Sequence, residues 1–88
     1  MSKHYVYMLR CADDTLYCGY TPSPENRLKK HNLGTASRYT RARLPVKMVF
    51  LMEFDDKKEA LRTEYTIKKL SKKEKEKLVA ENPFCISE

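Results

Sequence analysis

Two β-prone runs, residues 4–10 and 15–21, follow one another near the start of the chain. They are rich in Tyr, Val, Met and Leu, and the segment Ala12-Asp13-Asp14 between them contains turn-forming residues. Two such runs joined by a short polar segment predict a β-hairpin. This hairpin constrains the fold most, because a chain of 88 residues forms only one core and the remaining elements must pack onto it.

A helix is expected directly after the hairpin, over residues 24–33. Ser23 is a candidate N-cap, Pro24 suits the first helical position, and Gly34 is a candidate helix stop. Residues 35–45 are polar and basic, so we expect turns there rather than a regular element.

The second half of the chain predicts one strand and two helices. A nearly continuous apolar run over residues 46–54 predicts a third strand that is central in the sheet or well covered. Asp56 and Ser71 are each followed three residues later by Glu, the pattern of a capping box at a helix start. We therefore expect helices over residues 56–70 and 71–80.

These elements predict an α+β fold of order β-β-α-β-α-α. Its core would be a three-stranded antiparallel sheet flanked by about three helices. One domain is expected over residues 1–82, with residues 83–88 as a C-terminal tail that begins at Pro83. The pattern does not set the order of the strands.

The composition is that of a small globular protein of the cytoplasm. Hydrophobic residues make up 41% of the chain, and no apolar run approaches the ~20 residues that span a bilayer. The N-terminal residues lack the pattern of a signal peptide, and the three cysteines include no CxxC pair. We expect Cys18 to pack inward as a small hydrophobic residue.

Positive charge is concentrated in one part of the sequence. The net charge is +6, yet residues 27–47 contain seven basic residues and no acidic one. An uncompensated stretch of this kind favours contact with the phosphates of a nucleic acid, although a solvated loop is the alternative. The residues expected to contact the nucleic acid are Lys29, Lys30, Arg38, Arg41 and Arg43.

Four polar side chains are expected to converge on the hairpin. Tyr7 and Tyr17 fall on one face of the two strands by the alternation of side chains. Arg27 and His31 are four residues apart, so they share one face of the following helix and can point at a single ligand. The alternative is a simple aromatic pair on the hairpin with Arg27 and His31 exposed to solvent.

An acidic residue interrupts the apolar stripe of the helix expected over residues 56–70. That stripe consists of Ala60, Leu61 and Ile67. Glu64 falls angularly within it, and a carboxylate turned towards a core or a cleft needs a cation, a metal ion or hydrogen bonds. The alternatives are a salt bridge to Lys68 or a stripe centred on Leu61 and Tyr65.

Taken in order, these residues resemble the GIY-YIG nuclease domain, over nearly the whole chain. The resemblance is closest to small stand-alone bacterial GIY-YIG proteins of uncharacterised role. The segments that carry it are Tyr5-Val6-Tyr7-Met8-Leu9, Leu16-Tyr17-Cys18-Gly19-Tyr20-Thr21, Arg27-Leu28-Lys29-Lys30-His31-Asn32 and Ala60-Leu61-Arg62-Thr63-Glu64.

The resemblance implies a metal-dependent endonuclease that hydrolyses phosphodiester bonds in DNA, with branched or damaged DNA among the candidate substrates. It implies one Mg²⁺ or Mn²⁺ ion, with Glu64 as the metal ligand. The implied catalytic residues are Tyr7, Tyr17, Arg27, His31 and Glu64, and Tyr5 and Gly19 match structural positions of the motif. Tyr5 stands where the family has glycine, and Cys18 where it has isoleucine.

Proton transfer sets a further requirement on the implied site. A tyrosine with a pKa of about 10 is a poor base near neutral pH, so Tyr7 needs a nearby cation or a proton acceptor, and His31 is a candidate for that role. Arg27 would hold the phosphate through its fork of donors. Substrate preference would come from residues 35–45 or from a protein partner.

Two other functions are compatible with the same sequence. A nucleic-acid-binding module without catalysis would use the basic stretch and stack its tyrosines on unpaired bases. A protein-interaction domain would use its Tyr and Arg residues as binding hot spots. Cleavage of nucleic acid separates these alternatives from the nuclease.

Overall fold

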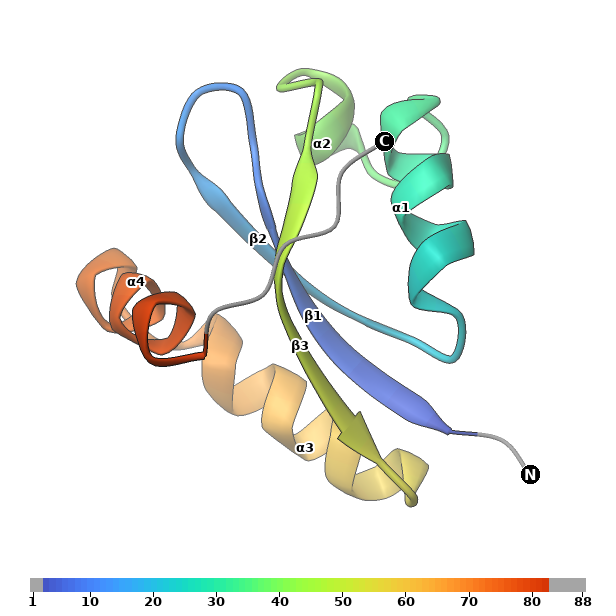
Figure 1. Cartoon of the computed structure of the whole chain (residues 1–88), viewed down its shortest axis with the longest axis vertical. Coiled ribbons are helices and arrows are strands. Elements are labelled where there is room, and N and C mark those ends of the chain that lie inside the picture. The colour runs from blue at the N-terminus through green and yellow to red at the C-terminus, as the bar shows by residue number, and fades with distance from the viewer. Residues whose placement is uncertain (1–2, 83–88) are drawn as a thin grey trace.

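The computed structural model describes residues 3–82, and the expected tail over residues 83–88 lies outside them. Three strands and four helices follow one another in the order β-β-α-α-β-α-α, an α+β arrangement that confirms the expected fold class (Figure 1). Within the described residues, no helix is long and apolar enough to cross a membrane. The elements are β1 (His4–Arg10), β2 (Leu16–Thr21), α1 (Pro24–Asn32), α2 (Arg38–Arg41), β3 (Lys47–Phe54), α3 (Lys57–Lys68) and α4 (Lys72–Glu81).

The three strands form one antiparallel sheet with the order β2-β1-β3. β1 is therefore the central strand, and it pairs with β2 through the predicted hairpin and with β3 on its other side. Of the two alternatives expected for this strand, central or well covered, the structure shows the second: β3 is an edge strand, and Met48, Val49 and Phe50 within it are buried. Its apolar run is explained by contact with helices rather than by a central position.

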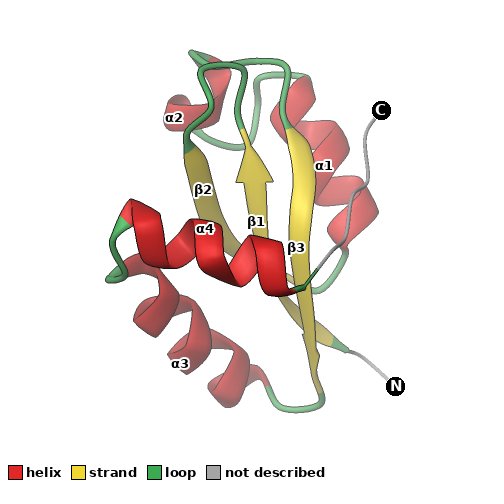
Figure 2. Cartoon of the chain, turned by 60° about the vertical axis from the view of Figure 1, so that its left-hand side comes forward, coloured by secondary structure: helices red, strands yellow, loops and turns green. Residues whose placement is uncertain are grey.

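Helices cover both faces of this sheet. Figures 1 and 2 show α1 and α2 on one side of the strands and α3 and α4 on the other. Val6, Tyr7, Met8 and Leu9 are consecutive in β1 and all four are buried. Since neighbouring side chains of a strand point to opposite faces, this run can be buried only if both faces are covered.

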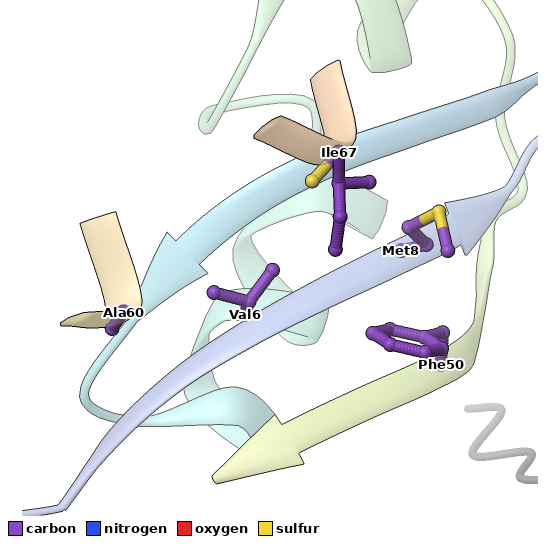
Figure 3. Packing of buried hydrophobic residues seen from close by; sticks show 6 residues of the cluster. Val6, Met8, Phe50, Ala60 and Ile67 are labelled. Atoms are coloured by element: carbon purple, nitrogen blue, oxygen red, sulfur yellow. The ribbon is translucent and has the colours of Figure 1, made fainter. Parts of the chain in front are cut away.

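The two faces of the sheet form two separate apolar clusters. Val6 and Met8 pack with Cys18, Phe50, Ala60 and Ile67 beneath α3, as Figure 3 shows for the labelled members of this cluster. The prediction that Cys18 packs inward is therefore confirmed. On the opposite face, beneath α1, the buried cluster consists of Tyr7, Leu9, Cys11, Leu28, Val46 and Met48.

The apolar stripe of α3 is narrower than the sequence predicts. Ala60 and Ile67 are buried, but Leu61 is 41% exposed and lies on the solvent side. The alternative stripe centred on Leu61 and Tyr65 is also wrong, because Tyr65 is exposed as well. A helix packed on one sheet needs only a narrow contact, and Ala60 allows the backbone to approach closely.

Local capping hydrogen bonds set where the helices begin, and the sequence predicts some of these bonds. Ser71 and Glu74 form the expected capping box at the start of α4. Asp56 caps α3 by accepting a hydrogen bond from the backbone N–H of Lys58, and the reciprocal half of the box is not formed, contrary to the prediction. Ser23 precedes α1 without a side-chain cap, so the pre-set backbone of Pro24 starts that helix.

A short helix, α2, lies where turns were predicted. Ser37 caps it by accepting a hydrogen bond from the backbone N–H of Tyr39. The segment Arg38–Arg41 is only four residues long, so it has no hydrophobic periodicity that a sequence could display. Polar turn-forming residues and a one-turn helix have nearly the same sequence signature.

A paired set of charges attaches α4 to the end of β1. The Arg10 guanidinium donates to both oxygens of Glu76, with Nη2 and Oε1 2.7 Å apart. Lys72 pairs with the same carboxylate at 2.6 Å. The two cations hold the pKa of Glu76 well below its usual range, with the hydrogen bond from Arg10 as the largest cause.

Glu76→Gln should weaken the attachment of α4. We expect the free energy of unfolding to fall by about 1–2 kcal/mol, because a charged two-point hydrogen bond is lost and, among residues 3–82, Arg10 keeps Asp14 at 3.5 Å as its remaining ion-pair partner. Urea denaturation followed by circular dichroism measures the change. The exposed Glu81 at the end of the same helix is the matched control: Glu81→Gln should change stability by less than about 0.5 kcal/mol. Equal effects of the two substitutions would show that the Arg10 pair does not stabilise the fold.

Candidate active site

A chain of buried hydrogen bonds links β1, α1 and α2. Tyr7 Oη and His31 Nε2 lie 2.8 Å apart, and His31 Nδ1 lies 2.8 Å from Thr40 Oγ1. The Thr40 hydroxyl in turn donates to the carbonyl oxygen of Ser37 at 3.3 Å. Tyr7, His31 and Thr40 are 2%, 1% and 0% exposed, so solvent has almost no access to these bonds.

The Tyr7 side chain reaches His31 because Gly19 leaves space for its ring. Tyr7 and Gly19 are directly opposite each other in the β1–β2 register. A Cβ atom at residue 19 would lie only 2.5 Å from Tyr7 Oη and 2.6 Å from Cζ. The glycine is therefore a steric requirement of the Tyr7 position, since atoms essentially never approach this closely without a shift of the neighbour.

Tyr17 lies beside this chain within a cluster of aromatic rings. Its ring centroid is 5.3 Å from that of His31 and 6.5 Å from that of Tyr7. Tyr17 opposes Leu9 in the register, so Tyr7 and Tyr17 are diagonal neighbours rather than a direct cross-strand pair. The two alternatives considered from the sequence, contact between the Tyr7 and Tyr17 rings and convergence of both on His31, are thus both present.

The outer side of Tyr17 is covered by Tyr39 from α2. The two rings stack with centroids 5.9 Å apart and an interplanar angle of 28°. Arg43 lies over the Tyr39 ring, with its Cζ atom 3.8 Å from the centroid. Such cation–aromatic contacts hold planar groups in one orientation.

Burial governs the ionisation of the central pair. Removal from water raises the pKa of the Tyr7 phenol, Tyr17 adds to this effect, and the Arg27 cation opposes it. Burial, with a smaller contribution from the Arg27 cation, lowers the pKa of His31 to about 4. At neutral pH, Tyr7 is therefore a protonated phenol and His31 a neutral imidazole.

Arg27 connects this pair to the surface. It is half-buried on α1, one turn before His31, and its charge acts on both Tyr7 and His31. It also lines a pocket at the start of α1, together with Thr21, Pro22, Ser23, Asn26 and Lys30. Arg27 is thus placed between the buried hydrogen bonds and a solvent-accessible hollow that contains a second cation, Lys30.

Glu64 of α3 forms an ion pair with Lys68, at 3.3 Å, as one of the alternatives predicted. Its side chain remains 18% exposed, and its charge raises the pKa of Tyr7 and of Cys18, which places it within electrostatic reach of the phenol. Among residues 3–82, no three His, Cys, Asp or Glu side chains gather as a metal site. A lone carboxylate still fits Mg²⁺, which usually keeps several waters and takes one or two protein carboxylates.

The predicted nucleic-acid contacts fall into two groups. Lys29, Lys30, Arg38 and Arg41 are exposed on α1 and α2. Arg43 instead pairs with Asp13 at 2.9 Å and donates to the carbonyl of Tyr39 at 2.8 Å. Its charge is therefore committed within the protein.

Two residues of the site have no counterpart among the predicted ones. Thr40 and Tyr39 belong to α2, which the sequence did not reveal as a helix. The one available signal is Ser37, a residue type that often starts helices. Tyr5, which the resemblance matches to a structural position of the motif, is half-buried in β1 opposite Thr21.

The chain belongs to the GIY-YIG catalytic domain family, whose model matches residues 3–77. This confirms the resemblance described above, and it places the chain in a nuclease superfamily.

The relatives that the chain resembles are small proteins of similar length. It is 51% identical to a UPF0213 protein of Bacillus licheniformis over 80 residues, covering 91% of this chain and 82% of that protein. It is 50% identical to a UPF0213 protein of Natronomonas pharaonis, covering 91% of this chain and 94% of that one. Among solved structures, it resembles the UPF0213 protein BH0048 of Bacillus halodurans, with 46% identity, 89% and 83% coverage of the two chains, and a TM-score of 0.59.

Gly19→Ala should disrupt the Tyr7 position. The new methyl group overlaps the phenol, so we expect a loss of about 1–3 kcal/mol in the free energy of unfolding. Urea denaturation measures this loss. In a Tyr7→Ala background the ring is absent, and the same Gly19→Ala substitution should then be nearly neutral. A loss of equal size in both backgrounds would contradict the steric explanation.

His31 should make stability depend on pH. Its pKa is about 4 in the folded protein and near 6.5 when unfolded, so between these values the unfolded state binds the proton more tightly. The contribution of neutral His31 is complete above pH 6.5 and is lost as the pH falls towards 4, a loss of about 3 kcal/mol. Denaturation curves at several pH values measure this slope. His31→Gln should flatten the slope between pH 6.5 and 4, and an unchanged slope would contradict the depressed pKa.

Proposed function

We propose that this protein is a metal-dependent nuclease that hydrolyses phosphodiester bonds in nucleic acid, with DNA as the favoured substrate. The observation that carries the proposal is the buried hydrogen bond between Tyr7 and neutral His31, with Arg27 beside it at the edge of a pocket. Hydrolysis requires a base for the attacking water and a cation for the phosphate. These residues provide both in one place.

In the proposed reaction, Tyr7 relays a proton rather than acting as a free phenolate. A water proton passes to Tyr7 Oη while the phenolic proton passes to His31 Nε2. The water oxygen bonds to phosphorus, and the bond from phosphorus to the departing oxygen breaks. The relay avoids a buried phenolate, which the raised pKa of Tyr7 makes unfavourable.

Substrate binding would improve His31 as the acceptor. The Arg27 cation is one of the causes that lower the pKa of His31. A phosphate held by Arg27 offsets that positive charge, so the pKa of His31 should rise towards its ordinary value. The base would thus be strengthened when a phosphodiester is present.

Glu64 is the residue that would hold the divalent ion. Such an ion, when bound, supplies positive charge to stabilise the departing oxygen. Lys68 neutralises part of the Glu64 charge, and its side chain is half exposed and can swing away. Glu64 therefore offers a partly exposed carboxylate for this role.

The exposed basic residues would position the nucleic-acid backbone. Lys29, Lys30, Arg38 and Arg41 follow α1 and α2 on the side of the fold that carries Arg27. Contacts between such side chains and phosphates give affinity without reading the base sequence. They support a nucleic-acid substrate and leave its sequence unspecified.

A cleavage assay tests the proposal. Wild-type protein should cut at least one of branched, single-stranded and supercoiled DNA in the presence of Mg²⁺ or Mn²⁺. Glu64→Gln should lower the rate by roughly 100-fold or more, because it removes the carboxylate charge proposed to hold the metal ion. Arg27→Lys should lower the rate by at least about 10-fold, because lysine keeps the charge but loses the fork of donors that fits a phosphate. Glu59→Gln, at an exposed position of α3, is the matched control and should retain the wild-type rate.

The outcomes separate the three candidate functions. Binding of DNA without cleavage, equal in wild type and both variants, would favour a binding module. If neither DNA nor RNA binds at low salt, the nuclease is excluded and a protein-interaction domain is favoured.

A further inference from the structure

We propose that Thr40 is a positioning residue that holds His31 in the tautomer with the proton on Nδ1. In this tautomer Nε2 carries a lone pair and accepts the proton of Tyr7. The effect on catalysis rests on the proposed nuclease function, but the tautomer itself does not depend on any activity.

The hydrogen bonds assign the tautomer by counting donors and acceptors. With the proton on Nδ1, the Tyr7 hydroxyl donates to Nε2, Nδ1–H donates to Thr40 Oγ1, and the Thr40 hydroxyl donates to the carbonyl of Ser37. Each of the three donors then has one acceptor. No buried side-chain nitrogen or oxygen in the described part of the chain is left without a partner.

The opposite tautomer does not satisfy the same groups. A proton on Nε2 would donate to Tyr7 Oη, and the phenolic hydrogen would then have no acceptor, because His31 is the hydrogen-bond partner found for that hydroxyl among residues 3–82. Tyr7 is 2% exposed, so bulk water rarely replaces the missing acceptor, and the attacking water of the proposed reaction donates to this oxygen and so is not that acceptor. A buried donor without a partner is strongly unfavourable.

The position of Thr40 in α2 sets the direction of its hydroxyl group. Thr40 is the third residue after the cap Ser37, where a threonine hydroxyl reaches back to the carbonyl three residues earlier. The distance of 3.3 Å is longer than that of the other two bonds, but Thr40 can donate only one hydrogen. Donation to Ser37 leaves the oxygen lone pairs facing His31, so Thr40 acts as the acceptor there.

The assigned tautomer is the one that the proton relay requires. If Nε2 already carried a hydrogen, it could not accept the phenolic proton while water attacks the phosphate. Thr40 would thus act through His31, without touching the substrate. Loss of the hydroxyl group should lower turnover by about 10- to 100-fold. This is less than the loss expected when a general base is removed altogether, because a fraction of the molecules keeps the tautomer that can accept the proton.

Nitrogen-15 NMR of the intact protein tests the tautomer directly. The chain contains only two histidines, and His4→Gln identifies the signals of His31. We expect wild-type His31 to show a protonated, pyrrole-like Nδ1 and an unprotonated, pyridine-like Nε2 at pH 7. Thr40→Val, which replaces the hydroxyl with a methyl group, should move His31 towards the Nε2–H form, and Thr40→Ser should restore the wild-type pattern.

Cleavage rates provide the second readout. Thr40→Val should lower kcat with little change in KM, and Thr40→Ser should recover most of the rate. Thr66 is the matched control, because its hydroxyl donates to the carbonyl of Arg62 at an exposed position of α3, without contacting His31. Thr66→Val should leave both the His31 spectrum and the cleavage rate unchanged.

The results distinguish failure of this inference from failure of the nuclease proposal. Wild-type His31 with its proton on Nε2 would overturn the role of Thr40, even if Thr40→Val does not fold. A wild-type Nδ1–H tautomer that Thr40→Val leaves unchanged would also overturn it. If no substrate is cleaved but the NMR shifts follow the expected pattern, the positioning role stands and the nuclease function is the part that fails.

Discussion

The structure depends on the burial of the central strand, β1, on both faces. Four consecutive side chains, from Val6 to Leu9, are removed from solvent, and this is possible only with helices on each side of the sheet. One face supplies the apolar contact with α3. The other face carries Tyr7 towards α1, so the strand that organises the core also delivers the phenol to the candidate site.

Low polarity around Tyr7 and His31 has opposite effects on their affinity for protons. It raises the pKa of the phenol and lowers that of the imidazole, so both groups remain neutral over the physiological range. Neither is a strong base by itself. Their hydrogen bond allows a proton to move through the pair, so that the charge formed is a cation on His31 rather than a phenolate on Tyr7, and the nearby Arg27 makes that transfer sensitive to a bound anion.

The sequence predicted the parts of this arrangement that depend on period and spacing. The hairpin, the helix carrying Arg27 and His31, and the inward position of Cys18 follow from alternation and the four-residue helical repeat. The edge position of β3 cannot be predicted from the sequence, because an apolar run has the same pattern in an edge strand covered by helices as in a central strand.

The features of the site that the sequence did not predict depend on a very short helix or on contacts between residues far apart in the chain. Thr40 contacts His31 through a one-turn helix, and four residues show no period. Arg43 looked like part of a basic surface, but its partner Asp13 is 30 positions away in the hairpin turn. The pairing of Glu64 with Lys68 follows from their four-residue spacing and is one of the alternatives predicted, whereas the exposure of Leu61 depends on how closely α3 approaches the sheet.

The hydrogen bonds of His31 differ in how much chain they enclose. The bond to Thr40 closes a loop of nine positions, and the bond to Tyr7 closes one of 24. The entropy of loop closure favours the shorter one by about 1 kcal/mol. Fixing the imidazole from within the segment that joins α1 to α2 therefore costs less chain entropy than fixing it from the central strand.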